Sequence, residues 1–158
     1  MICSPTSDLA LVSSIVSEPR IHRRMCNDES PKVSGYLALM EESQRIRGDM
    51  IVLVSDPEPI GIFVLANVPE ARFPDAAEAY HCFLPSVWGR TEAILRECLS
   101  WVWRETGIQR LTARVPGYNR LSLRLALAVG FREVSRAVNV VIKGGRMFNV
   151  INLQIDKP

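Results

Sequence analysis

The strongest pattern in the chain is an amphipathic helix with a strand on either side. At 91–105 the apolar residues recur three and four positions apart, which places them along one helix face. Before this helix, residues 76–84 form an apolar strand pattern that stops at Pro85, and after it residues 111–115 alternate as a strand. A strand–helix–strand unit with short connections predicts a sheet that buries one face against the helix.

The remaining segments extend this unit to one domain over residues 1–158. Helical periodicity covers 7–25, with a break at Pro19, and returns at 35–45 and 119–129. Strand patterns cover 50–55, 60–68, 131–142 and 146–155, and the last two flank a Lys-Gly-Gly turn. The segments 27–32 and 68–75 are expected to be loops. No linker or repeat interrupts the order, so we predict an α+β or mixed α/β fold with helices on both faces of one sheet.

Composition excludes several classes of function. The net charge of +2, from 19 basic and 17 acidic side chains, is too balanced for an electrostatic nucleic-acid binder. The longest apolar run, Ile60–Ala66, is far shorter than the roughly 20 residues that a membrane helix needs. The first residues lack the basic region of a signal peptide. We therefore expect a soluble, cytoplasmic protein that contacts neither nucleic acid nor membrane.

Cysteine and histidine are placed unfavourably for a metal site. The 4 cysteines form no C-x-x-C pair, and His22 and His81 stand alone. Zinc sites need such ligands at close spacing, so no metal is expected. A disulfide framework is equally unexpected in a chain of this length.

Three places have residue types suited to chemistry, each with an ordinary structural alternative. The turn Pro85–Thr91 opens a helix, so its backbone N–H groups could bind phosphate or could form a plain strand-to-helix connection. Asn119 is suited to a helix N-cap, and Ser122 could donate a proton from the first turn or lie on the surface. Glu78 could serve as a general base on an amine or could belong to a solvated strand face.

Taken together, residues 78–131 resemble the GNAT superfamily of acyl-CoA N-acyltransferases, especially its ribosomal-protein N-acetyltransferase branch. Trp88–Arg90 and Thr91–Ile94 match the two ends of the branch motif W-G-(K/R)-G-x-x-T-E-A-L. A second motif, N-x-x-S-x-x-L-x-x-x-x-G-F, is matched by Asn119, Ser122, Leu125, Gly130 and Phe131. The resemblance implies a mostly antiparallel, twisted sheet of about six to seven strands.

The same resemblance implies an activity and a set of site residues. The activity is transfer of an acetyl group from acetyl-CoA to an amine of a protein or small molecule, by direct attack. Glu78 would be the base and Ser122 the acid that protonates the departing thiolate. The cofactor-binding residues would be Cys82, Phe83 and Leu84 on the strand, Gly89, Arg90 and Thr91 at the helix start, and Asn119.

Two departures from the family pattern support a second hypothesis. About three residues that normally complete the pyrophosphate loop are missing between Arg90 and Thr91, and Ala126 occupies the position of a frequent tyrosine acid. Such losses are typical of a catalytically inactive GNAT-like domain that acts as a binding or assembly module, for example in phage particle assembly. The acceptor amine or protein partner is not specified. The apolar strand 147–155 would allow homodimer formation if it lay uncovered at an edge.

Overall fold

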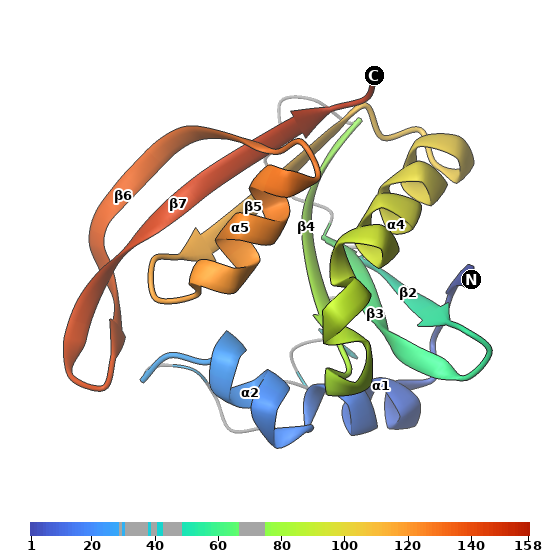
Figure 1. Ribbon diagram of the computed structural model, residues 1–158, viewed down its shortest axis with the longest axis horizontal. Helices are drawn as coiled ribbons and strands as arrows, with labels where there is room; N and C mark the ends of the chain where they lie inside the picture. Colours follow the sequence, from blue (N-terminus) through green and yellow to red (C-terminus); the bar gives the residue numbers. More distant parts are fainter. Residues whose placement is uncertain (29, 31–37, 39–40, 43–48, 67–74) are drawn as a thin grey trace.

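The computed structural model describes residues 1–28, 30, 38, 41–42, 49–66 and 75–158. Its elements, in chain order, are β1 (Ile2–Pro5), α1 (Leu9–Val16), α2 (Pro19–Met25), β2 (Met50–Ser55), β3 (Pro59–Ala66), β4 (Ala76–Phe83), the 3-10 helix η1 (Pro85–Arg90), α4 (Thr91–Glu105), β5 (Arg110–Pro116), α5 (Arg120–Ala128), β6 (Arg132–Lys143) and β7 (Arg146–Asp156). Figure 1 shows the resulting sheet with its helices. The mixed α/β class predicted from the sequence is confirmed.

The described strands form one seven-stranded sheet in the order β1-β2-β3-β4-β5-β7-β6. Every neighbouring pair is antiparallel except β4 and β5, which run parallel. The mostly antiparallel sheet is therefore confirmed, but the edge argument for a homodimer is wrong. Strand β7 lies between β5 and β6 and has no open edge. The outer strand of this half is β6, where Val134, Val138 and Val140 are exposed.

Helices cover both faces of the sheet, because successive residues of each strand point to opposite sides. On one face, α4 and α5 pack on alternate strand residues such as Phe63, Leu111 and Leu153. On the other, α1 and α2 pack on the intervening residues, including Ile62 and Cys82. None of the described helices is long and apolar enough to span a bilayer.

The predicted break at Pro19 is confirmed, since α1 ends at Val16 and α2 begins at that proline. Strand β1 was not predicted. It has four residues, mostly exposed, and owes its conformation to backbone pairing with β2, so its side chains carry no pattern. The helix expected over 35–45, apart from Ala38, Glu41 and Glu42, and nearly all of the loop expected over 68–75 lie outside the described residues.

The turn between β6 and β7 is fastened to the end of α2. The backbone N–H groups of Gly144 and Gly145 donate to the Asp28 carboxylate at 2.9 and 3.0 Å, which lowers the pKa of Asp28. Lys143 Nζ donates to the carbonyl oxygens of Arg23 and Cys26. Both glycines have positive φ, a conformation that glycine adopts without strain. These contacts fix α2 beside the opening between β4 and β5.

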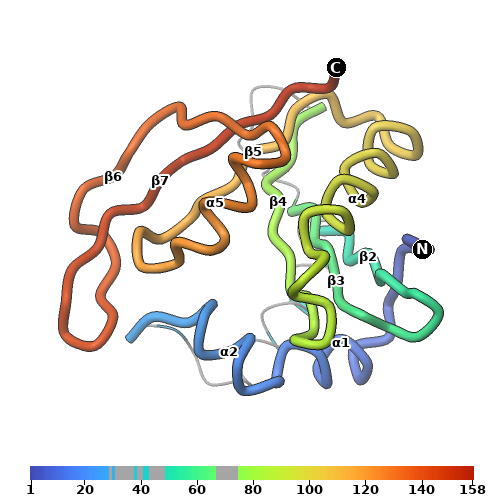
Figure 2. The backbone as a smooth tube through the Cα atoms, viewed as in Figure 1, coloured from blue at the N-terminus to red at the C-terminus, as the bar shows by residue number. Residues whose placement is uncertain are grey.

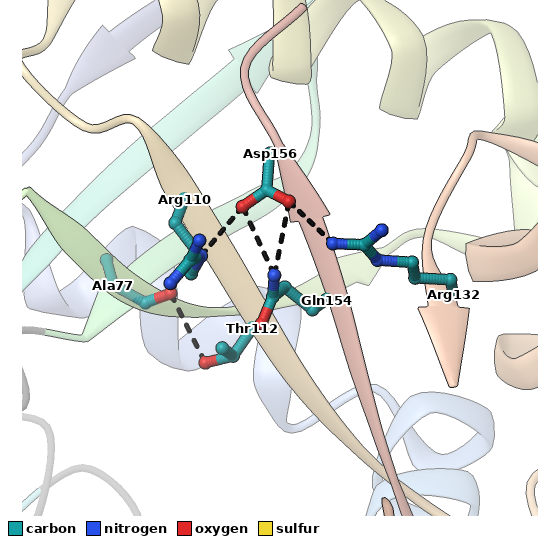
Figure 3. A network of polar contacts seen from close by, with 6 residues as sticks. All are labelled: Ala77, Arg110, Thr112, Arg132, Gln154 and Asp156. Atoms are coloured by element: carbon teal, nitrogen blue, oxygen red, sulfur yellow. Dashed lines mark hydrogen bonds and ion pairs between the residues drawn. The ribbon is translucent and has the colours of Figure 1, made fainter. Parts of the chain in front are cut away.

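At the opposite end of the sheet, one carboxylate joins three strands (Figure 3). Asp156 accepts hydrogen bonds from Arg110 Nε at 2.7 Å, Arg132 Nη2 at 2.8 Å and Gln154 Nε2 at 3.2 Å. The Arg110 hydrogen bond is the largest of the effects that lower the pKa of Asp156 from its ordinary 3.8. The network ties β5 and β6 to β7.

We predict that Asp156→Asn lowers the melting temperature at pH 7. A carboxyl whose pKa is lower in the folded state stabilises the fold above its ordinary pKa of 3.8 and loses that effect as the pH falls through the folded value. The melting curves of wild type and variant should therefore converge at acid pH. A constant difference at every pH in thermal unfolding would show that the charge is not responsible.

Candidate active site

Strands β4 and β5 separate after a short parallel contact. Their register covers only Ala76–Glu78 against Arg110–Thr112. Beyond it, β4 stays paired with β3 and β5 stays paired with β7, so the two strands diverge, as the tube in Figure 2 shows. A cavity of about 320 Å³ occupies the gap between them. Glu78 lies at the point of divergence and lines this cavity.

The backbone of β4 presents alternate residues to the gap. Leu84 N–H donates to the Ile60 carbonyl at 2.8 Å, and the Leu84 carbonyl accepts from Val87 N–H at 3.1 Å. In an antiparallel pair this register also directs the backbone N–H and C=O groups of Cys82 to β3. The backbone groups of His81 and Phe83 are left directed at the gap.

Of the three strand residues predicted to bind the cofactor, two are therefore wrong as backbone contacts. Leu84 is fully engaged elsewhere and the Cys82 backbone faces β3, so only Phe83 of the predicted set faces the gap. The carbonyl of Phe83 accepts a hydrogen bond from Trp88 Nε1 at 2.9 Å. His81, which was not among the predicted residues, is the further residue whose backbone is directed at the gap.

The surroundings of Glu78 shift the pKa of its carboxyl group. Burial raises its pKa, the positive charge of Arg114 lowers it and the negative charge of Asp49 raises it further. A carboxyl with a pKa closer to neutrality than usual is a more effective proton acceptor at physiological pH. Glu78 is thus partly buried rather than part of a solvated face.

The start of α5 places two predicted residues on the same cavity. Asn119 is the N-cap, and its Oδ1 accepts from Ser122 N–H at 3.3 Å. This cap sets Ser122 in the first helical turn, three residues on. Asn119 and Ser122 both line the cavity that Glu78 lines. Ala126, at the position of the family tyrosine, is buried in the core.

Two other titratable groups of the gap, His81 and Cys82, are poorly suited to proton transfer at neutral pH. Burial lowers the pKa of His81 to about 4, and its ring stacks on Phe83 with centroids 4.8 Å apart. Burial raises the pKa of the Cys82 thiol to about 12, and Cys82 Sγ donates to Met25 Sδ at 3.0 Å. A thiol held protonated is a weak nucleophile, so Cys82 is a packing residue here.

The helix start differs from an open phosphate-binding loop. Residues 85–90 form η1, which leads directly into α4, so its backbone N–H groups are used within the 3-10 turn. Thr91, which the resemblance implies for cofactor binding, donates from Oγ1 to the Trp88 carbonyl at 3.0 Å. The segment that leads into α4 is therefore a closed 3-10 turn.

A second cavity, of about 450 Å³, continues from the first toward this turn. The two cavities share Met25, His81, Cys82, Asn119 and Ser122. Gly89 and Thr91, two of the residues that the resemblance implies for cofactor binding, line the second cavity. Arg90 does not, because Arg90 Nη1 forms an ion pair with Asp56 Oδ2 at 2.6 Å on the β2–β3 turn.

Two other arginines line the second cavity instead. Arg24 comes from α2 and Arg124 from α5. The Arg24 guanidinium stacks 3.8 Å from the Trp88 ring centroid. Sequence reasoning missed Arg24, since nothing in the run Ile-His-Arg-Arg-Met shows which arginine faces a cavity on distant elements. Within the described ranges, no three His, Cys, Asp or Glu side chains gather as metal ligands.

Comparison with solved structures identifies the fold. The chain is similar to spermidine N-acetyltransferase from Vibrio cholerae in complex with CoA and spermine, with TM-score 0.78, 16% identity and coverage of 98% and 94% of the two chains. It is also similar to ribosomal-protein-alanine N-acetyltransferase from Brucella melitensis, with TM-score 0.75, 17% identity and coverage of 99% and 100%. A third is yncA, a putative acetyltransferase from Salmonella typhimurium with its cofactor acetyl-CoA, with TM-score 0.74, 20% identity and coverage of 99% and 93%.

The chain therefore has the fold of the GNAT acetyltransferases along almost its whole length. No protein-family model matches the sequence, and neither does any curated protein.

Proposed function

We propose that the chain is an N-acetyltransferase that uses acetyl-CoA and acts on an amine of a small molecule or protein. The observation that carries this proposal is the convergence of Glu78, Asn119 and Ser122 on one cavity at the divergence of β4 and β5. A carboxyl with a raised pKa and a helix-start hydroxyl are the groups that amine acylation needs. The GNAT fold of the whole chain supports the same activity.

The gap has features that suit acetyl-CoA. The pantetheine arm contains amide groups, which can pair with β4 backbone at His81 and with Phe83 N–H as an added strand would. Arg24 and Arg124 supply positive charge toward the phosphates. When bound, the thioester supplies an activated acetyl group.

In the proposed reaction the chain's residues move protons. Glu78 accepts a proton from the acceptor ammonium, which leaves a nitrogen lone pair free to attack. The nitrogen forms a bond to the acetyl carbon and the carbon–sulfur bond breaks. Ser122 protonates the leaving sulfur, and the second nitrogen proton, lost as the amide forms, returns to the Ser122 oxygen. The test is release of free CoA thiol that requires both an amine and Glu78.

A second candidate is a GNAT-fold domain that binds a partner without catalysis. The closed turn at 85–90 favours it, because this turn offers fewer backbone N–H groups to a pyrophosphate than an open loop would. The hydrogen bond from Trp88 to Phe83 also occupies a carbonyl on the pantetheine side. This candidate predicts no saturable binding of acetyl-CoA.

The arginines that line the second cavity should contact the phosphates of acetyl-CoA, and Arg90 provides the control. We expect Arg24→Gln and Arg124→Gln each to weaken acetyl-CoA binding about fivefold, the effect of one lost hydrogen bond of about 1 kcal/mol. Arg90→Gln should leave the dissociation constant nearly unchanged, because Arg90 is held by Asp56. Titration calorimetry measures all three, with pantetheine, which lacks these phosphates, as a ligand that the variants should not affect. A dominant effect of Arg90→Gln would contradict this assignment.

A further inference from the structure

Two side chains of opposite charge, on neighbouring strands, line the first cavity. Glu78 on β4 and Arg114 on β5 both border it. Side chains alternate along a strand, and Leu111 and Val115 pack with α4 and α5. Arg114 therefore lies on the opposite face of the sheet. Glu78 shares that face, since Ala77 and Ala79 belong to the core beneath α4 and α5.

These two groups interact without forming an ion pair. The positive charge of Arg114 acts on Glu78. Yet within the described residues no ion pair of 4 Å or less joins them, and Arg114 is exposed. Arg110 and Arg132, by contrast, share the single carboxylate of Asp156 (Figure 3). Arg114 is thus a cationic group that faces a cavity and is available to an anionic ligand.

Among the residues that the structure describes, the rest of the cavity lining is uncharged at neutral pH. It consists of apolar residues such as Val16, Ile62 and Phe63, together with neutral polar groups that include Asn119 and Ser122. Glu78, near which Asp49 adds negative charge, and the guanidinium of Arg114 together form a receptor for a ligand with both charges. A dicationic ligand would place one ammonium beside the Arg114 guanidinium, and the repulsion between these like charges would disfavour binding.

We propose that the acceptor is a small zwitterionic amine of the α-amino acid type, with its carboxylate on Arg114 and its amino group at Glu78. This inference rests on the proposed function for its chemistry, but the charge arrangement also predicts binding without acetyl-CoA. The guanidinium suits the carboxylate because its parallel N–H groups match two oxygens. The amino group then lies beside the base that must accept its proton.

The first arm of the test measures transfer. The common L-amino acids are compared with matched amines that lack the carboxylate, such as L-leucine with isoamylamine and L-phenylalanine with phenethylamine. We expect wild type to prefer an amino acid over its matched amine, and Arg114→Gln to reduce that preference in kcat/KM by about 10- to 100-fold through KM. Arg114→Lys should restore part of it. Arg104→Gln, an exposed arginine on α4, is the control and should change nothing.

The second arm measures binding by ligand-observed NMR without acetyl-CoA. Binding of an amino acid that Arg114→Gln abolishes supports the zwitterion site even if no acetyl group is transferred, in which case the proposed function alone fails. Three results would overturn the inference: no amino acid binds, the matched amines or a polyamine such as spermine are preferred, or Arg114→Gln affects amino acids and amines equally. Unchanged melting temperature of Arg114→Gln excludes misfolding as the cause.

Discussion

Glu78→Gln should reduce kcat for amine acetylation by about 100- to 1,000-fold, the range typical for loss of a general base. Glutamine keeps the size and hydrogen-bonding capacity of the side chain but cannot accept the amine proton. Because the change removes a proton acceptor, we expect KM for acetyl-CoA to remain close to that of wild type. The measurement is free CoA thiol release at saturating acetyl-CoA.

The pH dependence separates a catalytic role of Glu78 from a structural one. Glu78 must be deprotonated to act, so wild-type kcat/KM should fall as the pH drops through its pKa, which burial raises above 4.5. The variant should lack this acidic limb. A carboxyl with a raised folded pKa disfavours the fold above its ordinary pKa, so Glu78→Gln should be at least as stable as wild type at pH 7. An intact acidic limb in the variant would exclude Glu78 as the base.

Gly61→Ala should destabilise the protein by about 3 kcal/mol, through overpacking between β3 and β4. A Cβ at Gly61 would lie 2.5 Å from Phe83 Cδ1 and would overlap the Cys82 carbonyl oxygen. That oxygen is backbone, and it cannot move away without disturbing the ladder that joins the strands. The same residues border the gap, so we expect acetyl-CoA binding to weaken as well. Chemical denaturation measures the loss of unfolding free energy.

The matched control is Gly107→Ala. Nothing lies within 4 Å of a Cβ at Gly107, and its backbone does not require glycine. This variant should therefore unfold within a few tenths of a kcal/mol of wild type, as surface substitutions usually do. Equal denaturation midpoints for the two alanine variants would show that β3 and β4 tolerate the extra methyl group.

Local patterns predicted most of the elements correctly. The apolar stripe at 91–105 coincides with α4, and Asn119 caps α5 where the N-cap preference placed it. These succeeded because periodicity and capping depend on residues close in the chain. The placement of β7 between β5 and β6 was not predicted, because strand order depends on contacts between distant segments.

The residues of the candidate site also fall into two groups: those that local sequence predicts and those whose position depends on distant segments. Asn119 and Ser122 follow from motif positions and Glu78 from the base that the resemblance implies, and the structure brings all three to one cavity. Arg90 was expected to contact phosphate, but a partner on a distant turn, Asp56, holds it. Arg24 could not be singled out, because its position depends on how α2 is fastened to the β6–β7 turn.

Titration calorimetry of acetyl-CoA into the purified protein, with free CoA in parallel, tests the central proposal most directly. We expect saturable binding at micromolar strength that Arg24→Gln and Arg124→Gln weaken. Absence of heat and of any thermal shift at millimolar acetyl-CoA would contradict it. The closed turn at 85–90 would then define a GNAT-fold domain that binds a partner without acetyl transfer.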